Sequence, residues 1–209
     1  MTAWTNLIPS FASLACVLGL SACASLGDAR GGPEDPAAQL QLTSTAFLDQ
    51  QPLSMRYTCE GDEVSPPLRW SQLPAKTRSL VLIVDDAESG QVFTHWLLYD
   101  LPPSGVLSEG VKATHLPLGT RQARNDAGTT GYHGACPSSG RQQYHFKLFA
   151  LDTTLPDLDV PNRQRLESAM QGHILATGEL VGTYARKAES LEAHDEIDPD
   201  ADEPAGSGQ

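Results

Sequence analysis

This chain has few cysteines, few basic residues and no long apolar run. Its four cysteines include no Cys-x-x-Cys pair, which argues against a redox motif and a zinc ribbon. Its 14 Lys and Arg residues form no basic stripe, so we expect no nucleic-acid partner. The G-x-S-x-G, H-E-x-x-H and phosphate-loop motifs are also missing. The sequence therefore lacks the common signatures of a serine hydrolase, a zinc protease and a nucleotide-binding enzyme.

The negative charge gathers near the C-terminal end. Residues 187–209 hold eight acidic residues and one lysine, a net charge of −7 out of −12 for the whole chain. This segment has too few apolar residues to offset the entropy of ordering, so we predict a disordered acidic tail. The 209 residues are enough for one sizeable domain with a proper core.

Residues 1–22 have the pattern of a bacterial lipoprotein signal peptide. The apolar run Leu7–Leu20 is too short to span a bilayer comfortably, and the motif Leu-Ser-Ala-Cys closes it at Cys23. This motif resembles the lipobox, in which cleavage before the cysteine exposes a thiol for diacylglycerol and an amine for an acyl chain such as palmitate. Several acyl chains together give a stable membrane anchor. We therefore expect lipidation at Cys23.

The residues around Cys23 indicate where that anchor would hold the protein. Met1–Phe11 contains no Lys or Arg, which leaves an uncleaved anchor or a simple periplasmic signal as alternatives. Ala24 follows the cysteine in place of Asp, and by the usual sorting rule this favours the outer membrane of the cell envelope, facing the periplasm. Residues 23–39 are rich in Gly, Pro and Asp and are expected to form a flexible tether.

Two further cysteines, Cys59 and Cys136, lie in the body of the chain. In an oxidising compartment an isolated pair predicts a disulfide. Two unrelated buried thiols, or a reactive nucleophile, are the alternatives at this stage.

Apolar patterning predicts a mainly β fold. One helix is expected from Arg163 to about Gly172, with Asn162 as its N-cap and an apolar face that includes Leu166 and Met170. The segment Ser79–Asp85 is nearly all apolar, so we expect it to be buried on both faces of a sheet. The expected strands are 40–43, 79–85, 93–101, 144–151 and 175–184. This pattern indicates a β-sandwich with one or two short helices.

Several short segments, in order along the chain, resemble the phosphatidylethanolamine-binding protein family and its bacterial Raf kinase inhibitor-like branch. The resemblance covers residues 40–186 and implies a β-sandwich with a shallow pocket at one end. In the family this pocket binds phosphate, acetate or a phosphorylated head group. The segments that carry the resemblance are YTCEG (57–61), VSPPL (64–68), HW (95–96), RND (124–126), GY (131–132) and 144–152.

The first family signature is an Asp-Pro-Asp-x-Pro stretch at the end of a buried strand. Asp86 matches its first acid and Glu88 its second, whereas both prolines are absent. His95 matches the pocket histidine that donates to the bound anion. The resemblance therefore implies that Asp86, Glu88 and His95 line the ligand site.

The second signature supplies the rest of the implied ligand site. Gly134 and Pro137 match its loop, and Tyr144 matches its aromatic residue. Gln142 stands where the family has a second histidine. Because an amide donor carries no charge, we expect weaker phosphate binding than in relatives that keep the histidine.

The chemistry of these side chains allows an anion pocket. A histidine supplies an N–H or a charge, and the Tyr144 hydroxyl and the loop N–H groups around Gly134 add neutral donors. Asp86 would fix the histidine tautomer or bind loop amides. The alternative is that Asp86 and Glu88 are turn residues and His95 a satisfied core histidine. The nearby acidic run 60–63 is expected to be a solvated loop.

The sequence thus favours an envelope lipoprotein that binds a small anion or a phospholipid head group, or that regulates a protein partner at this pocket. The alternative is a hydrolase that uses His95 with Asp86 as a general-base pair. No cofactor is expected. The remaining histidines lack metal-ligand spacing, so no metal site is expected either: His115, His133, His145 and His173.

The lipobox makes the first testable prediction. Replacing Cys23 with Ser removes the thiol that would carry diacylglycerol, so the protein should move from the membrane fraction to the soluble periplasmic fraction. Fractionation and intact mass measure this. An unchanged membrane fraction, with no acyl mass on the unmodified sequence, would contradict the prediction.

Overall fold

The structure is a computed structural model that describes residues 38–88 and 91–186. The predicted signal peptide, the acidic tail and all but the end of the predicted tether lie outside the described residues. Four long strands form the body of the fold, and each contains a segment that the sequence predicts as a strand: β5 (Ser79–Glu88), β6 (Gln91–Leu101), β9 (Arg141–Leu151) and β10 (Ile174–Ala185). The mainly β prediction is therefore confirmed.

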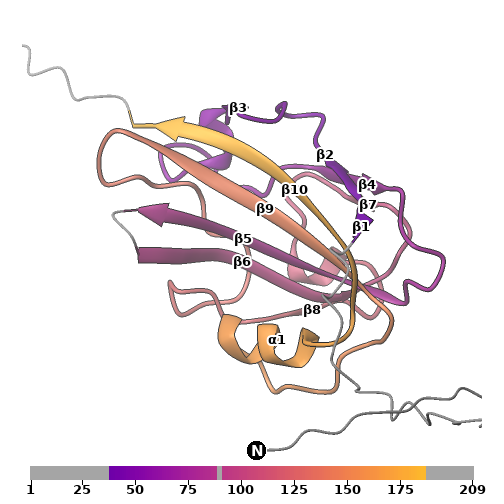
Figure 1. Ribbon diagram of the computed structural model, residues 1–209. Coiled ribbons are helices and arrows are strands. Elements are labelled where there is room, and N and C mark those ends of the chain that lie inside the picture. Colours follow the sequence, from indigo (N-terminus) through magenta and orange to yellow (C-terminus); the bar gives the residue numbers. More distant parts are fainter. Residues whose placement is uncertain (1–37, 89–90, 187–209) are drawn as a thin grey trace, which may run out of the picture. The chain divides into compact units, whose positions relative to one another are not determined.

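These strands form one large sheet, and a small sheet packs on it as a second layer (Figure 1). The large sheet has the order β1-β10-β9-β5-β6-β8, and β3 also pairs with β10. Its four long strands are antiparallel, whereas β1 and β3 run parallel to β10. The small sheet has the order β2-β4-β7. The short strands are β1 (Ala38–Gln39), β2 (Gln41–Thr43), β3 (Gln51–Pro52), β4 (Leu68–Ser71), β7 (Val106–Leu107) and β8 (Arg121–Gln122).

Sequence patterning predicts β2 but not the other short strands. Periodicity needs several residues to become visible, and a strand of two to four residues shows too little of it. Ala38–Gln39, the last two residues of the predicted tether, pair with β10 as β1. Two short 3-10 helices, Met55–Tyr57 and Ala113–His115, complete the regular elements of the described part.

The apolar core lies on both faces of the large sheet. Between the sheets, Leu68 and Trp70 of β4 join a cluster that includes Leu82 of β5. On the opposite face, Val81 of β5 joins a second cluster with Leu166 of the helix. Burial on both faces explains why the sequence of β5 is almost continuously apolar, as predicted.

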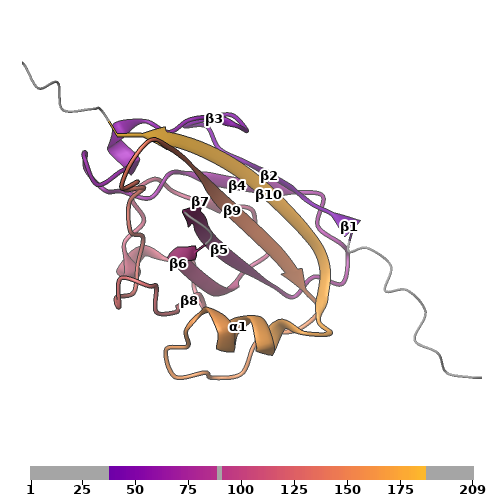
Figure 2. The ribbon, with the colours of Figure 1, turned by 60° about the vertical axis from the view of Figure 1, so that its left-hand side comes forward.

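The single α-helix of the described residues, α1 (Arg163–Met170), covers this second face (Figures 1 and 2). The Asn162 side chain accepts a hydrogen bond from the N–H of Arg165 at 3.0 Å, so the predicted N-cap is confirmed. Leu166 and Met170 are buried, and Ala169 packs against the same cluster. The helix ends two residues earlier than the predicted Gly172, which follows it with a positive φ of 78°.

A disulfide between Cys59 and Cys136 joins the loop after the first 3-10 helix to the loop before β9. The two Cα atoms are 5.4 Å apart, and the cysteines are 77 residues apart in sequence. An isolated parallel bridge between Thr58 and Ala135 lies beside it. The predicted pairing is therefore present, and it leaves neither sulfur as a free thiol.

This cross-link makes a prediction about stability. Replacing both cysteines with serine should lower the free energy of unfolding by about 2–4 kcal/mol, because the long closed loop restricts the unfolded chain. Urea unfolding under non-reducing conditions measures this change. Cys23→Ser is the matched control, since it alters a cysteine outside the body. Equal midpoints for the double variant and the unmodified chain would contradict the prediction.

Candidate functional site

The candidate site lies at the end of β5, where the apolar sequence of that strand gives way to acidic residues. Asp86 of β5 pairs directly with Tyr144 of β9. On its other side, β6 carries one extra residue, because Val84 pairs with Trp96 while Asp85 pairs with Thr94. The extra residue of this β-bulge is His95. Bulges re-aim side chains next to functional sites, and this one brings His95 toward Asp86 and Tyr144.

The three side chains are buried and close together. Asp86, His95 and Tyr144 are only 4%, 3% and 1% exposed. Nε2 of His95 lies 3.6 Å from Oδ2 of Asp86. The Tyr144 ring meets the imidazole edge-on with centroids 5.2 Å apart, and Phe93 does the same from another side at 4.9 Å. Two aromatic rings therefore pack against His95 of the Asp86–His95 pair.

Hydrogen bonds fix the orientation of His95. Its Nδ1 lies 2.9 Å from the carbonyl oxygen of His133, and since a carbonyl only accepts, Nδ1–H is the donor. Nε2 therefore faces Asp86. Among the described residues, neither His95 Nε2 nor Asp86 Oδ1 has a hydrogen-bond partner, although both atoms are buried. Such unsatisfied groups are uncommon in folded proteins, and they do not fit a core histidine whose nitrogens are both satisfied.

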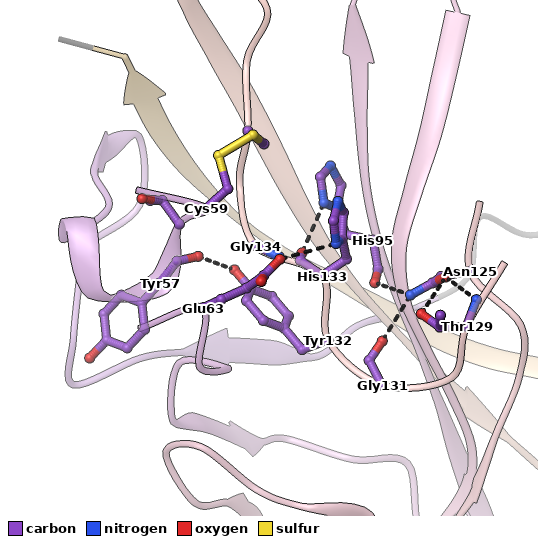
Figure 3. A network of polar contacts seen from close by, with 12 residues as sticks. Tyr57, Cys59, Glu63, His95, Asn125, Thr129, Gly131, Tyr132, His133 and Gly134 are labelled. Carbon is purple, nitrogen blue, oxygen red and sulfur yellow. Dashed lines mark hydrogen bonds and ion pairs between the residues drawn. A yellow bond between two sulfur atoms is a disulfide. The ribbon is translucent and has the colours of Figure 1, made fainter. Parts of the chain in front are cut away.

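The loop after β8 is fastened to β6 beside His95 (Figure 3). The Asn125 side chain donates to the carbonyls of His95 and Gly131, at 3.3 and 3.2 Å, and accepts from Thr129. Asp126 accepts a hydrogen bond from the N–H of Thr94 at 2.7 Å. These contacts place His133 next to His95, and the two rings stack with their centroids 5.8 Å apart.

Glu63 holds the next part of this loop. Its Oε1 accepts the Gly134 N–H at 3.0 Å and lies 3.1 Å from Nδ1 of His133 (Figure 3). The acidic run 60–63 is exposed, as predicted, but Glu63 has this additional contact. Among the loop N–H groups around Gly134 that we expect to serve as donors, the one of Gly134 itself already donates to Glu63, and the place of Gly134 in a ligand site stays a prediction.

Gly134 is required by close packing. A Cβ there would lie 2.8 Å from the carbonyl carbon of Thr58 and 2.9 Å from the nitrogen of Cys59. The loop therefore approaches the 58–59 backbone as closely as the bridge and the disulfide demand. The Tyr132 hydroxyl also joins the two segments by donating to the Tyr57 carbonyl at 2.8 Å. Burial raises the pKa of Tyr132.

The remaining predicted ligand residues lie around this end of the sandwich. Pro137 is buried in the same loop as Gly134, directly after the disulfide. Gln142 is half-buried on β9, on the same face as Tyr144 two residues later, and it pairs with Tyr184 of β10. Glu88 is the last residue of β5, and its side chain lies outside the described atoms.

The outer part of this region carries a cation and an acid. The Arg186 guanidinium lies 3.3 Å from the sulfur of Cys136 and 3.8 Å from the carboxylate of Glu60. The Tyr184 hydroxyl donates to Glu60, and burial, followed by this hydrogen bond, raises the pKa of Tyr184. The tyrosine therefore stays protonated and acts as a donor.

Asp85 provides an internal comparison for Asp86. It precedes Asp86, faces the opposite side of the sheet and is equally buried, at 2% exposed. Lys147 lies 2.9 and 3.0 Å from its two oxygens, and Arg163 of α1 lies 2.5 Å from one of them. Asp85 is thus a neutralised structural carboxylate, whereas the one basic side chain that pairs with Asp86 among the described residues is His95.

Other features of the described residues do not compete with this site. No group of three or more His, Cys, Asp and Glu in residues 38–88 and 91–186 is placed to hold a metal ion. A hollow of about 430 Å³ is lined by β9 and β10 residues that include Lys147 and Glu179, and another of about 380 Å³, near the start of β9, is lined by residues that include Gln142 and His145. No helix of the described part is long and apolar enough to cross a membrane.

Sequence reasoning brought Asp86, His95, Gly134 and Tyr144 to one region but assigned no role to four other residues. Asn125, Glu63, His133 and Phe93 reach the site only through tertiary contacts. For Asn125 the sequence does offer a signal, because this residue lies in the RND segment (124–126) that carries the family resemblance. Glu63 and His133 are 70 residues apart in the numbering, and no local spacing relates them.

Residues 43–185 match the family described as Phosphatidylethanolamine-binding protein. A UPF0098 protein from Methanothermobacter thermautotrophicus is 42% identical over 150 residues, which cover 70% of this chain and 99% of the relative. A UPF0098 protein from Chlamydia muridarum is 39% identical over 152 residues, which cover 69% of this chain and 98% of the relative.

Solved structures agree with these relatives. A Chlamydia trachomatis protein described as a homologue of phosphatidylethanolamine-binding protein superimposes with a TM-score of 0.66 at 38% identity, covering 72% of this chain and 99% of that one. E. coli YbcL, described as a new member of the mammalian family, gives a TM-score of 0.67 at 31% identity, covering 72% and 100%. By the match of its sequence over most of its length and by its two-sheet fold, the chain belongs to the phosphatidylethanolamine-binding protein family.

Proposed function

We propose that this protein is a binding protein of the bacterial cell envelope, anchored by lipid at Cys23, whose pocket at Asp86, His95 and Tyr144 takes a phosphate or a phosphorylated head group. The name of the matched family supports a phospholipid-related ligand. The anchor would hold the domain close to membranes that contain such head groups. The pocket would also serve to regulate a protein partner, as in the Raf kinase inhibitor-like branch that the sequence resembles.

One observation carries the ligand-binding proposal. Asp86 Oδ1 and His95 Nε2 are buried, adjacent and without hydrogen-bond partners among the described residues. Each unsatisfied buried group costs roughly 1–3 kcal/mol, so a fold that keeps two of them side by side favours a ligand that satisfies them. Gln142 and Tyr144, on the adjacent strand β9, carry neutral groups of the type that donates to an anion.

We favour binding over the alternative of hydrolysis. A general-base pair of His95 and Asp86 would need a nucleophile within reach. Cys136, which lies in the same loop as Gly134, is held in the disulfide and has no free thiol. The absence of G-x-S-x-G from the sequence points in the same direction.

Titration with phosphate tests the proposal. Inorganic phosphate and phosphorylethanolamine should bind with a dissociation constant in about the millimolar range, since a small ligand makes few contacts. Amide and side-chain NMR shifts should centre on residues 86, 95 and 144. Tyr144→Phe should weaken binding several-fold while keeping the ring packing. Shifts elsewhere on the domain, or no shifts, would reject the site.

Gln142 gives a matched pair of variants. Gln142→His restores a donor that can carry charge at the position where the family has its second histidine, so phosphate should bind about tenfold more tightly. The control is Gln143→His, which adds the same side chain one residue on, facing the opposite side of β9. Equal affinities for the two variants would show that Gln142 does not face the ligand.

A further inference from the structure

With a neutral His95 ring and an ionised Asp86, the two atoms that face each other at the centre of the proposed pocket are both acceptors. Nδ1–H of His95 donates to the His133 carbonyl, so in the neutral ring Nε2 is an acceptor. The Asp86 carboxylate is also an acceptor, and its Oδ2 faces this nitrogen at 3.6 Å. Two acceptors that face each other in a buried site are complementary to a group that brings a hydrogen of its own.

Three donors of the loop beside the pair are already engaged. The Gly134 N–H and the Nδ1 of His133 both contact Glu63. The Asn125 amide donates to two backbone carbonyls. The titratable groups around the pair are Tyr144 from β9, His133 from the loop, and Glu63 behind His133. The charged group among these, Glu63, is an acid, so the surroundings do not favour a fully deprotonated anion.

From this geometry we propose that the pocket selects a phosphoryl group that carries a proton, over sulfate and over phosphodiesters. Asp86 is the residue that determines this specificity, because its Oδ1 accepts the ligand's P–OH hydrogen. The inference rests on the proposed function, since it names which ligands the same pocket takes. It favours inorganic phosphate or a phosphate monoester over the diester of an intact phospholipid.

The chemistry of the ligands makes the distinction sharp. The second pKa of a phosphate monoester is about 6, so near neutral pH a sizeable fraction retains one P–OH group. Sulfate and a phosphodiester have the same tetrahedral shape but no such hydrogen. Each would place an oxygen lone pair against the Asp86 carboxylate. A buried polar site that is built to accept a ligand hydrogen strongly rejects an analogue that lacks it.

Calorimetric titration of the purified chain at about pH 6 tests the inference with four probes. These are inorganic phosphate, phosphorylethanolamine, sulfate and glycerophosphorylcholine. The first two should bind at least about tenfold more tightly than the last two. A preference for phosphorylethanolamine would point to a head-group source and a preference for inorganic phosphate to free phosphate, and either supports the inference.

Replacing Asp86 tests whether this residue causes the preference for phosphate over sulfate. In Asp86→Asn the amide can donate to sulfate, so the ratio of phosphate to sulfate affinity should fall toward one. Asp62→Asn is the control, because it removes the same charge from an exposed carboxylate that pairs with Arg56. In this variant the ratio of phosphate to sulfate affinity should be unchanged. His95→Gln is a second variant with an amide donor at the pocket, should Asp86→Asn fail to fold.

The outcomes separate the two proposals. Sulfate that binds the unmodified chain as tightly as phosphate overturns the proton-selective pocket while leaving the proposed function intact, and this comparison needs no variant. An unchanged ratio in folded Asp86→Asn overturns the role of Asp86. Absence of binding by both phosphates and by sulfate overturns the proposed function, and the inference with it.

Discussion

Burial of both faces of β5 is the constraint on which the rest of the structure depends. Apolar clusters cover the strand from the small sheet on one side and from α1 on the other. Side chains alternate along a strand, so the consecutive acids Asp85 and Asp86 are forced into opposite buried environments. A buried carboxylate is stable only with compensation, and the protein treats the two differently.

Asp85 receives its compensation inside the fold. Lys147 from β9 and Arg163 from α1 neutralise it, and this contact also joins the helix to the sheet. Asp86 has only the loosely paired His95, and one of its oxygens has no partner among the described residues. The two carboxylates of one strand therefore differ: Asp85 holds α1 to the sheet, and Asp86 is the one to which we assign a ligand in the proposed function.

The loop beside His95 is held at several points. Three separate devices hold the loop that carries His133 and Gly134: the Asn125 contacts to β6, the Glu63 contacts, and the disulfide from Cys136. All three restrain the backbone of this loop, so the His133 carbonyl that orients His95 is itself held in place. This arrangement places the histidine in one tautomer before any ligand arrives, which is the usual advantage of preorganised polar sites. The Glu63 and Asn125 contacts also occupy the N–H groups of Gly134 and Thr129.

The sequence by itself determined the long strands, the helix and its Asn162 cap, because periodicity and capping are local properties that 8 to 12 residues display. It also predicted the pairing of Cys59 with Cys136, the two cysteines of the body, and the structure decided between this disulfide and separate thiols. Only the tertiary structure decided that His95 is a bulge residue, that Glu63 takes the Gly134 N–H, and that Asp85 is neutralised while Asp86 is not. These contacts join residues far apart in the chain, and no local pattern encodes which distant partner will satisfy a given hydrogen-bonding group.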